Sequence, residues 1–264
     1  MKKYMLITGA GGGMGRAAAA HFASLGYGVL ALDVKPCEEG DNITYIEADV
    51  TSEESLRTAF ARIREETESL FAVLHFAGIY MLDSLVEMES DAFRRILEIN
   101  LTGVFSVNKL ALPMLSAGSR ILITTSELAP LDPLPFTGIY AVTKAALDKY
   151  AYALAMELQL KGIAVSVLRA GAVKTDMLGA STDALARFCE RTALYTCNAR
   201  RFRAVVDRVE ARAASPERIA KKAERILHRR RPPFVNAINR NPLLLLLHML
   251  PKRLQLFIIR RILK

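Results

Sequence analysis

Residues 8–16 read TGAGGGMGR, and they lie between an apolar run at 4–7 and an alanine-rich stretch at 17–25. The flanks predict a strand followed by a helix, and the glycines predict the tight turn that joins them. Glycines let the backbone approach a ligand closely, while the free N–H groups and the dipole at a helix start attract an anion. The stretch therefore predicts a pyrophosphate site at the end of a first parallel strand.

The next apolar run predicts a second strand at 28–32, and this strand ends at Asp33. A carboxylate at that point can accept hydrogen bonds from the hydroxyls of an adenosine ribose, and it repels a 2′-phosphate. Lys35 lies nearby and would attract such a phosphate. On balance Asp33 favours NAD over NADP as the bound dinucleotide.

Strands and helices continue to alternate along the chain. A strand at 43–48 precedes Asp49 and Val50, Ser52 begins a helix that runs to about residue 69, and a strand at 71–76 leads into Ala77 and Gly78. Strands that are apolar along their whole length predict a parallel sheet covered by helices on both faces. We expect an α/β doubly wound domain over 1–238 and a helical extension over 239–264.

Composition agrees with one globular α/β domain, because 264 residues with 52% apolar side chains can fill a sizeable core. The three cysteines and four histidines have neither a disulfide framework nor metal-ligand spacing, so we expect no metal. The apolar run near the N-terminus is too short for a signal-peptide core. We therefore expect a reduced, cytoplasmic location.

Tyr140 and Lys144 are four residues apart in an alanine-rich segment that predicts a helix, so both lie on one helix face. A phenol has a pKa of about 10, and a cation held beside it favours the phenolate. The pair is a candidate general acid and base. Taken alone, the same spacing also fits ordinary packing of an amphipathic helix.

Considered together, these motifs resemble the short-chain dehydrogenase/reductase family over roughly residues 3–230. Gly9, Gly13 and Gly15 match the family's T-G-x-x-x-G-x-G turn, and Ser126 precedes Tyr140 at the spacing usual in the family. The resemblance implies a Rossmann-type domain with a seven-stranded parallel sheet. Two departures are Phe76 and Ala170, where the family usually has asparagine and proline.

The resemblance also implies roles for individual residues. Tyr140 would exchange the substrate proton, Lys144 would lower the pKa of Tyr140 and hold the nicotinamide ribose, Ser126 would bind the substrate oxygen, and Asn100 would hold a water. The residues implied in cofactor binding are Gly9, Gly11, Gly12, Gly13, Met14, Gly15, Asp33, Asp49, Val50, Ala77, Gly78, Tyr140, Lys144, Gly171, Val173 and Thr175.

The substrate is expected to be apolar. Residues 127–139 form a proline-punctuated loop rich in apolar side chains, and 176–214 would be a lid whose Met177, Leu178 and Phe188 either face the substrate or pack in the core. We expect interconversion of a secondary alcohol and a ketone on a steroid, retinoid or lipid-like molecule. The alternatives are a reductase of 3-oxoacyl or other small carbonyls and a non-catalytic, membrane-associated NAD-binding protein; epimerases and dehydratases are disfavoured by their glycine spacing.

The excess positive charge is confined to the end of the chain. Residues 218–264 carry 13 Lys or Arg and one acid, while the preceding part is close to neutral, which disfavours nucleic acid as a partner. The longest apolar run within the leucine-rich, basic residues 239–264 is too short to cross a bilayer. They can lie in a lipid headgroup region as peripheral membrane contacts, cover the substrate cleft, or bury against a second subunit. The family resemblance implies a dimer or tetramer built through helices at 102–117 and 141–161.

Overall fold

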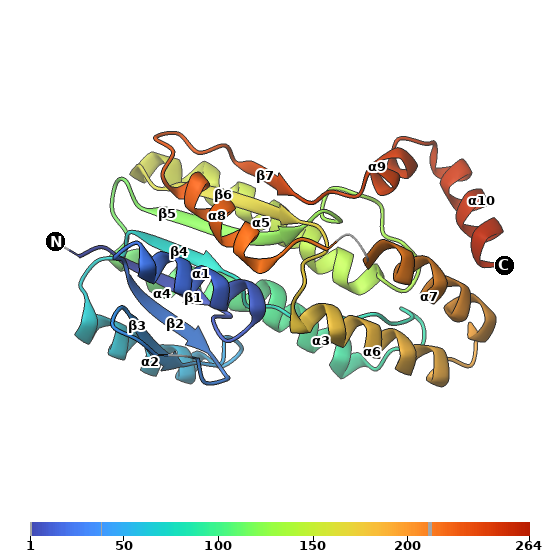
Figure 1. Cartoon of the computed structure of the whole chain (residues 1–264), viewed down its shortest axis with the longest axis horizontal. Helices are drawn as coiled ribbons and strands as arrows, with labels where there is room; N and C mark the ends of the chain where they lie inside the picture. The colour runs from blue at the N-terminus through green and yellow to red at the C-terminus, as the bar shows by residue number, and fades with distance from the viewer. Residues whose placement is uncertain (1, 38, 211–212) are drawn as a thin grey trace.

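Figure 1 shows the computed structural model, which describes residues 2–37, 39–210 and 213–264; the side chains of 176–183 and 205–210 lie outside that description. Within the described residues the sheet has seven strands in the order β3-β2-β1-β4-β5-β6-β7, and every neighbouring pair is parallel. The strands are β1 Tyr4–Thr8, β2 Gly28–Asp33, β3 Ile43–Glu47, β4 Ala72–His75, β5 Arg120–Ser126, β6 Ala164–Ala170 and β7 Val235–Ile238.

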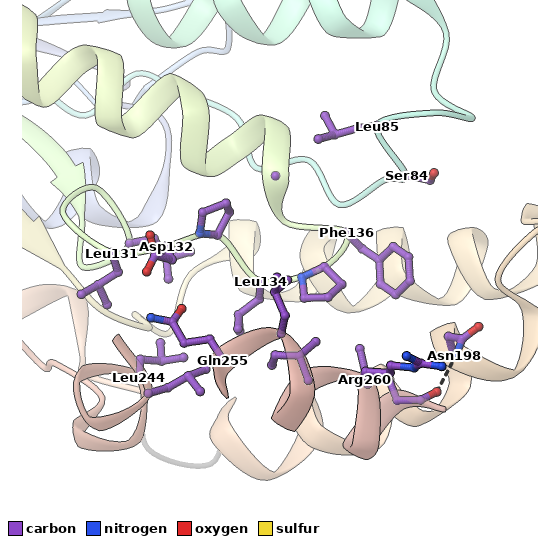
Figure 2. Close-up of a pocket in the computed structure, with 18 of the residues that line it drawn as sticks. Ser84, Leu85, Leu131, Asp132, Leu134, Phe136, Asn198, Leu244, Gln255 and Arg260 are labelled. Carbon is purple, nitrogen blue, oxygen red and sulfur yellow. Dashed lines mark hydrogen bonds between the residues drawn. The ribbon is translucent and has the colours of Figure 1, made fainter. Parts of the chain in front are cut away.

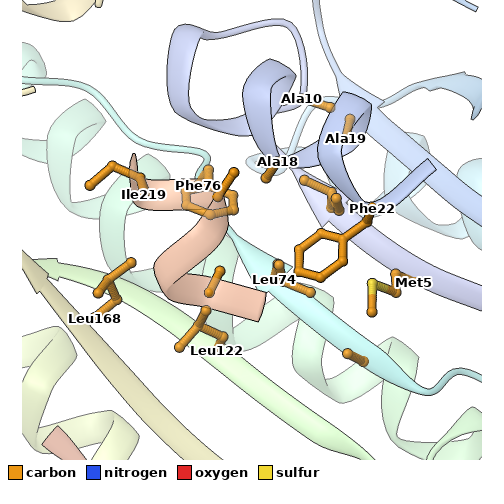
Figure 3. Packing of buried hydrophobic residues seen from close by; sticks show 14 of the residues in the cluster. Met5, Ala10, Ala18, Ala19, Phe22, Leu74, Phe76, Leu122, Leu168 and Ile219 are labelled. Atoms are coloured by element: carbon orange, nitrogen blue, oxygen red, sulfur yellow. The ribbon is translucent and has the colours of Figure 1, made fainter. Parts of the chain in front are cut away.

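Helices cover both faces of this sheet, as the alternating sequence predicts. The helices are α1 Gly13–Ser24, α2 Glu53–Glu66, α3 Ser90–Leu97, α4 Gly103–Ala111, α5 Gly138–Leu158, α6 Asp176–Arg191, α7 Thr196–Glu210, α8 Pro216–Leu227, α9 Pro242–His248 and α10 Lys252–Leu263. Side chains of α1 and α8 fill the core on one face, where Phe22 and Ile219 lie over Leu74, Leu122 and Leu168 (Figure 3). Side chains of α2, α4 and α5 fill the core on the other face.

The strand register places the predicted site residues along one edge. Thr8, the last residue of β1, pairs with Leu32 on one side and with His75 on the other. The glycine turn, Asp33 and the segment after β4 therefore leave the sheet at the same level. The strand order reverses between β1 and β4, and crevices at such a reversal are where open α/β sheets bind ligands.

The predicted elements are confirmed with small shifts at their ends. The side chain of Ser52 accepts a hydrogen bond from the N–H of Ser55 and so caps α2 as expected, but α2 ends at Glu66 because Thr67 is extended. The helix predicted over 102–117 is shorter and less regular. A π-helical turn at Glu98–Thr102 precedes α4, and a 3₁₀ turn at Leu112–Met114 follows it.

The chain ends in two helices at the opposite end of the molecule from the N-terminus, and the second of them, α10, packs against α7 (Figure 1). The side chain of Asn241 accepts a hydrogen bond from the N–H of Leu243 and caps α9, and Pro242 occupies the first turn. Pro251 separates α9 from α10. Among the described residues, the structure contains no helix long and apolar enough to cross a membrane.

Candidate active site

The turn between β1 and α1 requires glycine at two positions for steric reasons. Gly9 has φ +71°, and a Cβ there would lie 2.4 Å from the backbone nitrogen of Ala77. A Cβ at Gly15 would lie 2.1 Å from the carbonyl oxygen of Gly9. These contacts bring the start of α1 against the strand ends, and the glycines of the turn line the cavity beside them.

Asp33 is held in a fixed orientation at the end of β2. Its Oδ2 accepts a hydrogen bond of 2.9 Å from the N–H of Gly11, and its Oδ1 accepts one of 3.0 Å from the N–H of Lys35. Each carboxylate oxygen keeps a second lone pair for a ligand. The glycine turn and the acid predicted to read the ribose are thus one hydrogen-bonded unit.

A cavity of about 930 Å³ lies over this unit, and we call it the glycine-turn cavity. Of the predicted cofactor residues it is lined by Gly9, Gly11, Gly12, Gly13, Met14, Gly15, Asp33, Asp49, Val50, Ala77, Gly78 and Thr175. A glycine turn at the start of a helix, beside a carboxylate that can bind a ribose, fits a dinucleotide. Among the described residues, no cluster of three or more His, Cys, Asp or Glu could hold a metal ion.

Ser126, Tyr140 and Lys144 come together next to this cavity. Ser126 and Tyr140 line the same cavity, and Ser126 Oγ accepts a 3.1 Å bond from the N–H of Leu128. The Nζ of Lys144 lies 5.7 Å from the centre of the Tyr140 ring and donates a 3.3 Å bond to the carbonyl of Thr124. The sequence spacing thus places the predicted proton-transfer groups within reach of one another.

Burial dominates the acidity of both helix residues. It raises the pKa of Tyr140 to about 12, against a smaller lowering by the hydrogen bond with Ser126, and it lowers the pKa of Lys144 to about 8. The sequence predicted a lowered pKa for Tyr140 because of the Lys144 charge. In this structure that prediction is wrong in direction, because desolvation of the phenolate outweighs the other influences on it.

Asn100 is completely buried inside the π-helical turn that precedes α4. Its Oδ1 accepts from the N–H of Ile79 at 2.8 Å, and its Nδ2 donates to the carbonyl of Ile79 at 2.9 Å and to Thr143 Oγ1 at 3.1 Å. A Cβ at Gly78 would lie 3.2 Å from Asn100 Oδ1 and 3.6 Å from Lys144 Nζ, so both groups face Gly78. Asn100 therefore ties the segment after β4 to α5. Its predicted hold on a water stays a prediction.

A second cavity of about 570 Å³, the apolar cavity, contains Ser126 and Tyr140 in its wall. It shares Met14, Tyr80 and Thr175 with the glycine-turn cavity, so the two adjoin at these residues. Gly171 and Val173, which were predicted at the nicotinamide, also line it. Ser126 and Tyr140 thus line the cavity that adjoins the glycine-turn cavity.

The rest of the apolar cavity wall comes mainly from the end of the chain. Its aliphatic residues from α9, α10 and the turn between them are Leu243, Leu244, Leu246, Leu247, Leu250, Ile258, Ile259, Ile262 and Leu263. Phe188, a predicted wall residue, is instead buried in a core cluster against Phe136, with ring centres 4.7 Å apart. The side chains of Met177 and Leu178 lie outside the described residues. Phe202 of α7 lines the cavity and was not predicted.

A third cavity of about 790 Å³ lies on the other side of the loop that follows β5, and Figure 2 shows it. Asp132 in this loop forms an ion pair with Lys252 and a 3.1 Å hydrogen bond with His248. Asn198 of α7 donates a 2.6 Å hydrogen bond to the carbonyl of Leu263. Polar contacts therefore hold α9 and α10 over the apolar cavity, an arrangement that fits cleft covering, one of the three alternatives open for residues 239–264.

Three features of the site were not predicted. The Tyr80 ring lies 4.7 Å from the Tyr140 ring, centre to centre. Glu127, which lines the apolar cavity, accepts a 2.5 Å hydrogen bond from the N–H of Asn241. Asp148 forms a largely buried two-bond ion pair with Arg169. Only Asp148 had a sequence signal, since it is four residues from Lys144 and so shares its helix face.

Comparisons with known proteins agree with this geometry. The family model for short chain dehydrogenase matches residues 3–186. Estradiol 17-beta-dehydrogenase 2 of Mus musculus is 30% identical over 192 residues, which are 67% of this chain and 50% of the mouse protein. Oxidoreductase UcpA of Escherichia coli K12 is 32% identical over 186 residues, which are 66% of this chain and 71% of UcpA. The chain thus spans about half the length of the mouse relative.

Solved structures show the same fold. A dehydrogenase/reductase from Sinorhizobium meliloti superposes with a TM-score of 0.74 at 25% identity, covering 89% of this chain and 93% of that one. A short-chain dehydrogenase from Streptomyces avermitilis gives 0.77 at 19% identity, covering 99% and 97%. From the matched family model, the glycine turn and the grouped Ser126, Tyr140 and Lys144, we conclude that the chain belongs to the short-chain dehydrogenase/reductase family of oxidoreductases.

Proposed function

We propose that the protein interconverts a secondary alcohol and a ketone with NAD(H), on a bulky apolar substrate such as a steroid, retinoid or lipid-like alcohol. One observation carries the proposal. Ser126 and Tyr140 line the apolar cavity, which adjoins the glycine-turn cavity at Met14, Tyr80 and Thr175. A substrate carbon in the apolar cavity would therefore meet both the proton donor and the cofactor.

The glycine turn, Asp33 and the residues that line the glycine-turn cavity would hold the cofactor. When bound, a nicotinamide dinucleotide accepts or supplies the hydride. The fixed carboxylate of Asp33 favours the free ribose hydroxyls of NAD over the 2′-phosphate of NADP. Lys35, which also lines this cavity, would be the residue that accommodates NADP if both are used.

Tyr140 would donate a proton to the substrate oxygen during reduction and take it back during oxidation. Against the rise that burial causes, Ser126 lowers the pKa of Tyr140, and it would offer a second hydrogen bond to the substrate oxygen. Lys144 has a pKa of about 8, so it is mainly protonated at neutral pH. An ammonium beside a phenolate stabilises the phenolate, which is the form left after proton transfer.

The walls of the apolar cavity support the substrate class. Leucine and isoleucine side chains from α9 and α10 dominate the wall, and Glu127 is the only acidic or basic side chain among its described lining residues. A cavity of about 570 Å³ is within the range that holds a drug-sized ligand. The similarity to an estradiol dehydrogenase also supports an apolar substrate, whereas the name of UcpA indicates no substrate.

A cofactor-reduction screen tests the proposal. The full chain is incubated with NAD or NADP and with steroids, retinol, long-chain secondary alcohols and 3-hydroxyacyl thioesters, and formation of the reduced cofactor is followed by absorbance. We expect turnover of a polycyclic or long-chain alcohol with NAD. Turnover of the thioesters alone would favour the 3-oxoacyl alternative. Tight NAD binding without turnover of any compound would favour the non-catalytic one.

A further inference from the structure

Exposed apolar side chains are concentrated at the end of the chain. Of the twenty large apolar side chains exposed among the described residues, seven lie within 242–264, so this short segment carries an unusual share of them. They are Leu243, Leu246, Met249, Leu254, Leu256, Phe257 and Ile262. Exposed apolar surface gathered on two adjacent helices is typical of an interaction site.

The same segment carries only positive charge. Residues 239–264 contain six Lys or Arg and no Asp or Glu. Lys252 is paired with Asp132, but within the described part of the chain Arg253, Arg260, Arg261 and Lys264 are exposed and form no ion pair with an acid. Apolar groups interleaved with unpaired bases on a short helix match a surface that binds anionic lipid headgroups.

Some of these exposed residues also belong to the apolar cavity. Leu243, Leu246 and Ile262 are 69%, 60% and 50% exposed, and all three line the cavity that contains Ser126 and Tyr140. A side chain can line a cavity and also be exposed to solvent only where that cavity opens to the outside. The mouth of the apolar cavity is therefore bordered by the exposed leucines and isoleucine of α9 and α10.

We propose that the exposed face of α9 and α10 docks on the surface of an anionic membrane, with Leu254 and Phe257 entering the headgroup region. The mouth of the apolar cavity then opens toward the lipid. An apolar substrate dissolved in the bilayer could pass between Leu243, Leu246 and Ile262 without crossing water. Docking itself does not depend on the proposed reaction, because it uses residues outside both the catalytic group and the glycine turn.

A second copy of the chain fits this face less well. In a two-fold symmetric dimer the same patch meets itself, so the unpaired bases of both copies would be brought together. Like charges across an interface are unfavourable. A surface of anionic phosphate groups instead supplies the opposite charge to each of them.

Vesicle co-sedimentation tests the proposal with the full-length chain and without substrate. Phosphatidylcholine vesicles with and without phosphatidylserine are compared at low and high salt. We expect the protein to sediment with the anionic vesicles, less with the neutral ones, and less again as salt rises. Arg253→Glu/Arg261→Glu should weaken binding by about twentyfold or more, since each base near an anionic surface contributes roughly a factor of five.

Matched variants test whether vesicle binding depends on α9 and α10 or on exposed apolar and basic side chains anywhere on the surface. Leu254→Ser/Phe257→Ser removes two apolar groups that line neither cavity, and Leu25→Ser/Leu160→Ser removes two exposed ones elsewhere. Arg230→Glu/Arg231→Glu makes the same charge change away from α9 and α10. Only the α9 and α10 variants should lose vesicle binding. Equal loss in all variants, or no sedimentation of the unmodified chain, would overturn the proposal while leaving the reaction untouched.

Light scattering tests independently whether the exposed face of α9 and α10 binds a second copy of the chain. We expect Leu254→Ser/Phe257→Ser to have the same molar mass in solution as the unmodified chain. A lower mass for that variant, together with absent vesicle binding, would assign the face to subunit contact and overturn membrane docking.

Discussion

The acidity of Tyr140 is set by two opposing influences. Its surroundings exclude water and raise its pKa to about 12, while the hydroxyl of Ser126 stabilises the phenolate by a hydrogen bond. Lys144 is close enough to act on the ring but is itself poorly solvated. In the proposed reaction, Tyr140 gives its proton to a substrate oxygen and becomes a phenolate. Lys144 must keep its positive charge to stabilise that phenolate.

We predict that Tyr140→Phe lowers kcat by roughly 10²–10⁴, the usual contribution of a positioned general acid or base. Cofactor affinity should change little, because the glycine turn and Asp33 are untouched. Steady-state kinetics and a cofactor titration measure the two effects. Tyr152→Phe, an exposed tyrosine of the same helix, is the control and should keep full activity. Retention of most activity by Tyr140→Phe would remove Tyr140 from the mechanism.

The lowered pKa of Lys144 predicts that the free energy of unfolding depends on pH. Its folded pKa of about 8 lies below the ordinary 10.5, so the folded chain binds fewer protons than the unfolded chain between these values. The penalty for burying the charge is fully present below pH 8 and disappears as pH rises toward 10.5. Lys144→Met should therefore be more stable than the unmodified protein at pH 7, by up to about 3 kcal/mol.

Urea unfolding at several pH values measures this difference. The gain should shrink between pH 8 and pH 10.5. Lys149→Met, at an exposed position of the same helix, is the control and should show no such trend. A gain that stays constant with pH would mean that packing of the methionine, and not the buried charge, is responsible.

At the scale of elements, the ion pair between Asp148 and Arg169 joins α5 to β6. Arg169 donates to Asp148 at 2.6 and 3.1 Å, and Thr125 of β5 donates to the same carboxylate at 3.3 Å. Asp148 follows Lys144 by one helical turn. The pair therefore sets the position of the helix that carries both proton-transfer residues.

We predict that Asp148→Asn costs about 3–5 kcal/mol of unfolding free energy, because it leaves the largely buried Arg169 charge without its partner. The matched control is Asp91→Asn, which breaks an exposed pair with Arg94 and should cost no more than about 1 kcal/mol. Denaturant unfolding of both variants gives the comparison. Similar small losses in the two would show that the pair does not anchor α5.

The elements differ in how far the sequence reveals them. The glycine turn, the alternation of strands and helices, and the shared helix face of Tyr140 and Lys144 follow from local pattern and spacing. The place of Ser126 beside them follows from the family resemblance, and the structure has all of these features. The π-helical turn around Asn100 does not follow from local sequence pattern, because the hydrogen bonds of Asn100 are made with Ile79, in a distant segment. The burial of Phe188 and the position of α9 and α10 also depend on contacts between segments far apart in the chain.

At the scale of the whole molecule, Asp132 connects the loop after β5 to α9 and α10 through His248 and Lys252. We predict that Asp132→Ala loosens these helices. Trypsin should then cleave at Lys252 or Arg253 about fivefold faster, the factor for ~1 kcal/mol of lost contacts. KM for an apolar substrate should rise as well.

Limited proteolysis followed by mass spectrometry detects this cleavage. Asp41→Ala, at an exposed aspartate without an ion pair in the described part of the chain, is the control and should be cleaved at the unmodified rate. Unchanged cleavage in Asp132→Ala would show that apolar packing alone holds α9 and α10 in place.

The family resemblance implies an oligomer, and the outer sides of α4 and α5 offer a surface for one. Phe105 of α4, with Val142 and Met156 of α5, is exposed, and contact with a second copy would bury such side chains. We predict a dimer or tetramer by light scattering, and a smaller particle for Phe105→Glu/Met156→Glu. A monomeric unmodified chain would contradict this prediction.

The hydrogen bond from Asn241 to Glu127 has a consequence for the order of events in turnover. Glu127 is the next residue after Ser126, so the start of α9 is attached to the same backbone that presents the serine hydroxyl. Any displacement of α9 that separates Asn241 from Glu127 would break a bond to the residue next to Ser126. In the proposed reaction, movement of α9 would thus be coupled to the position of the Ser126 hydroxyl.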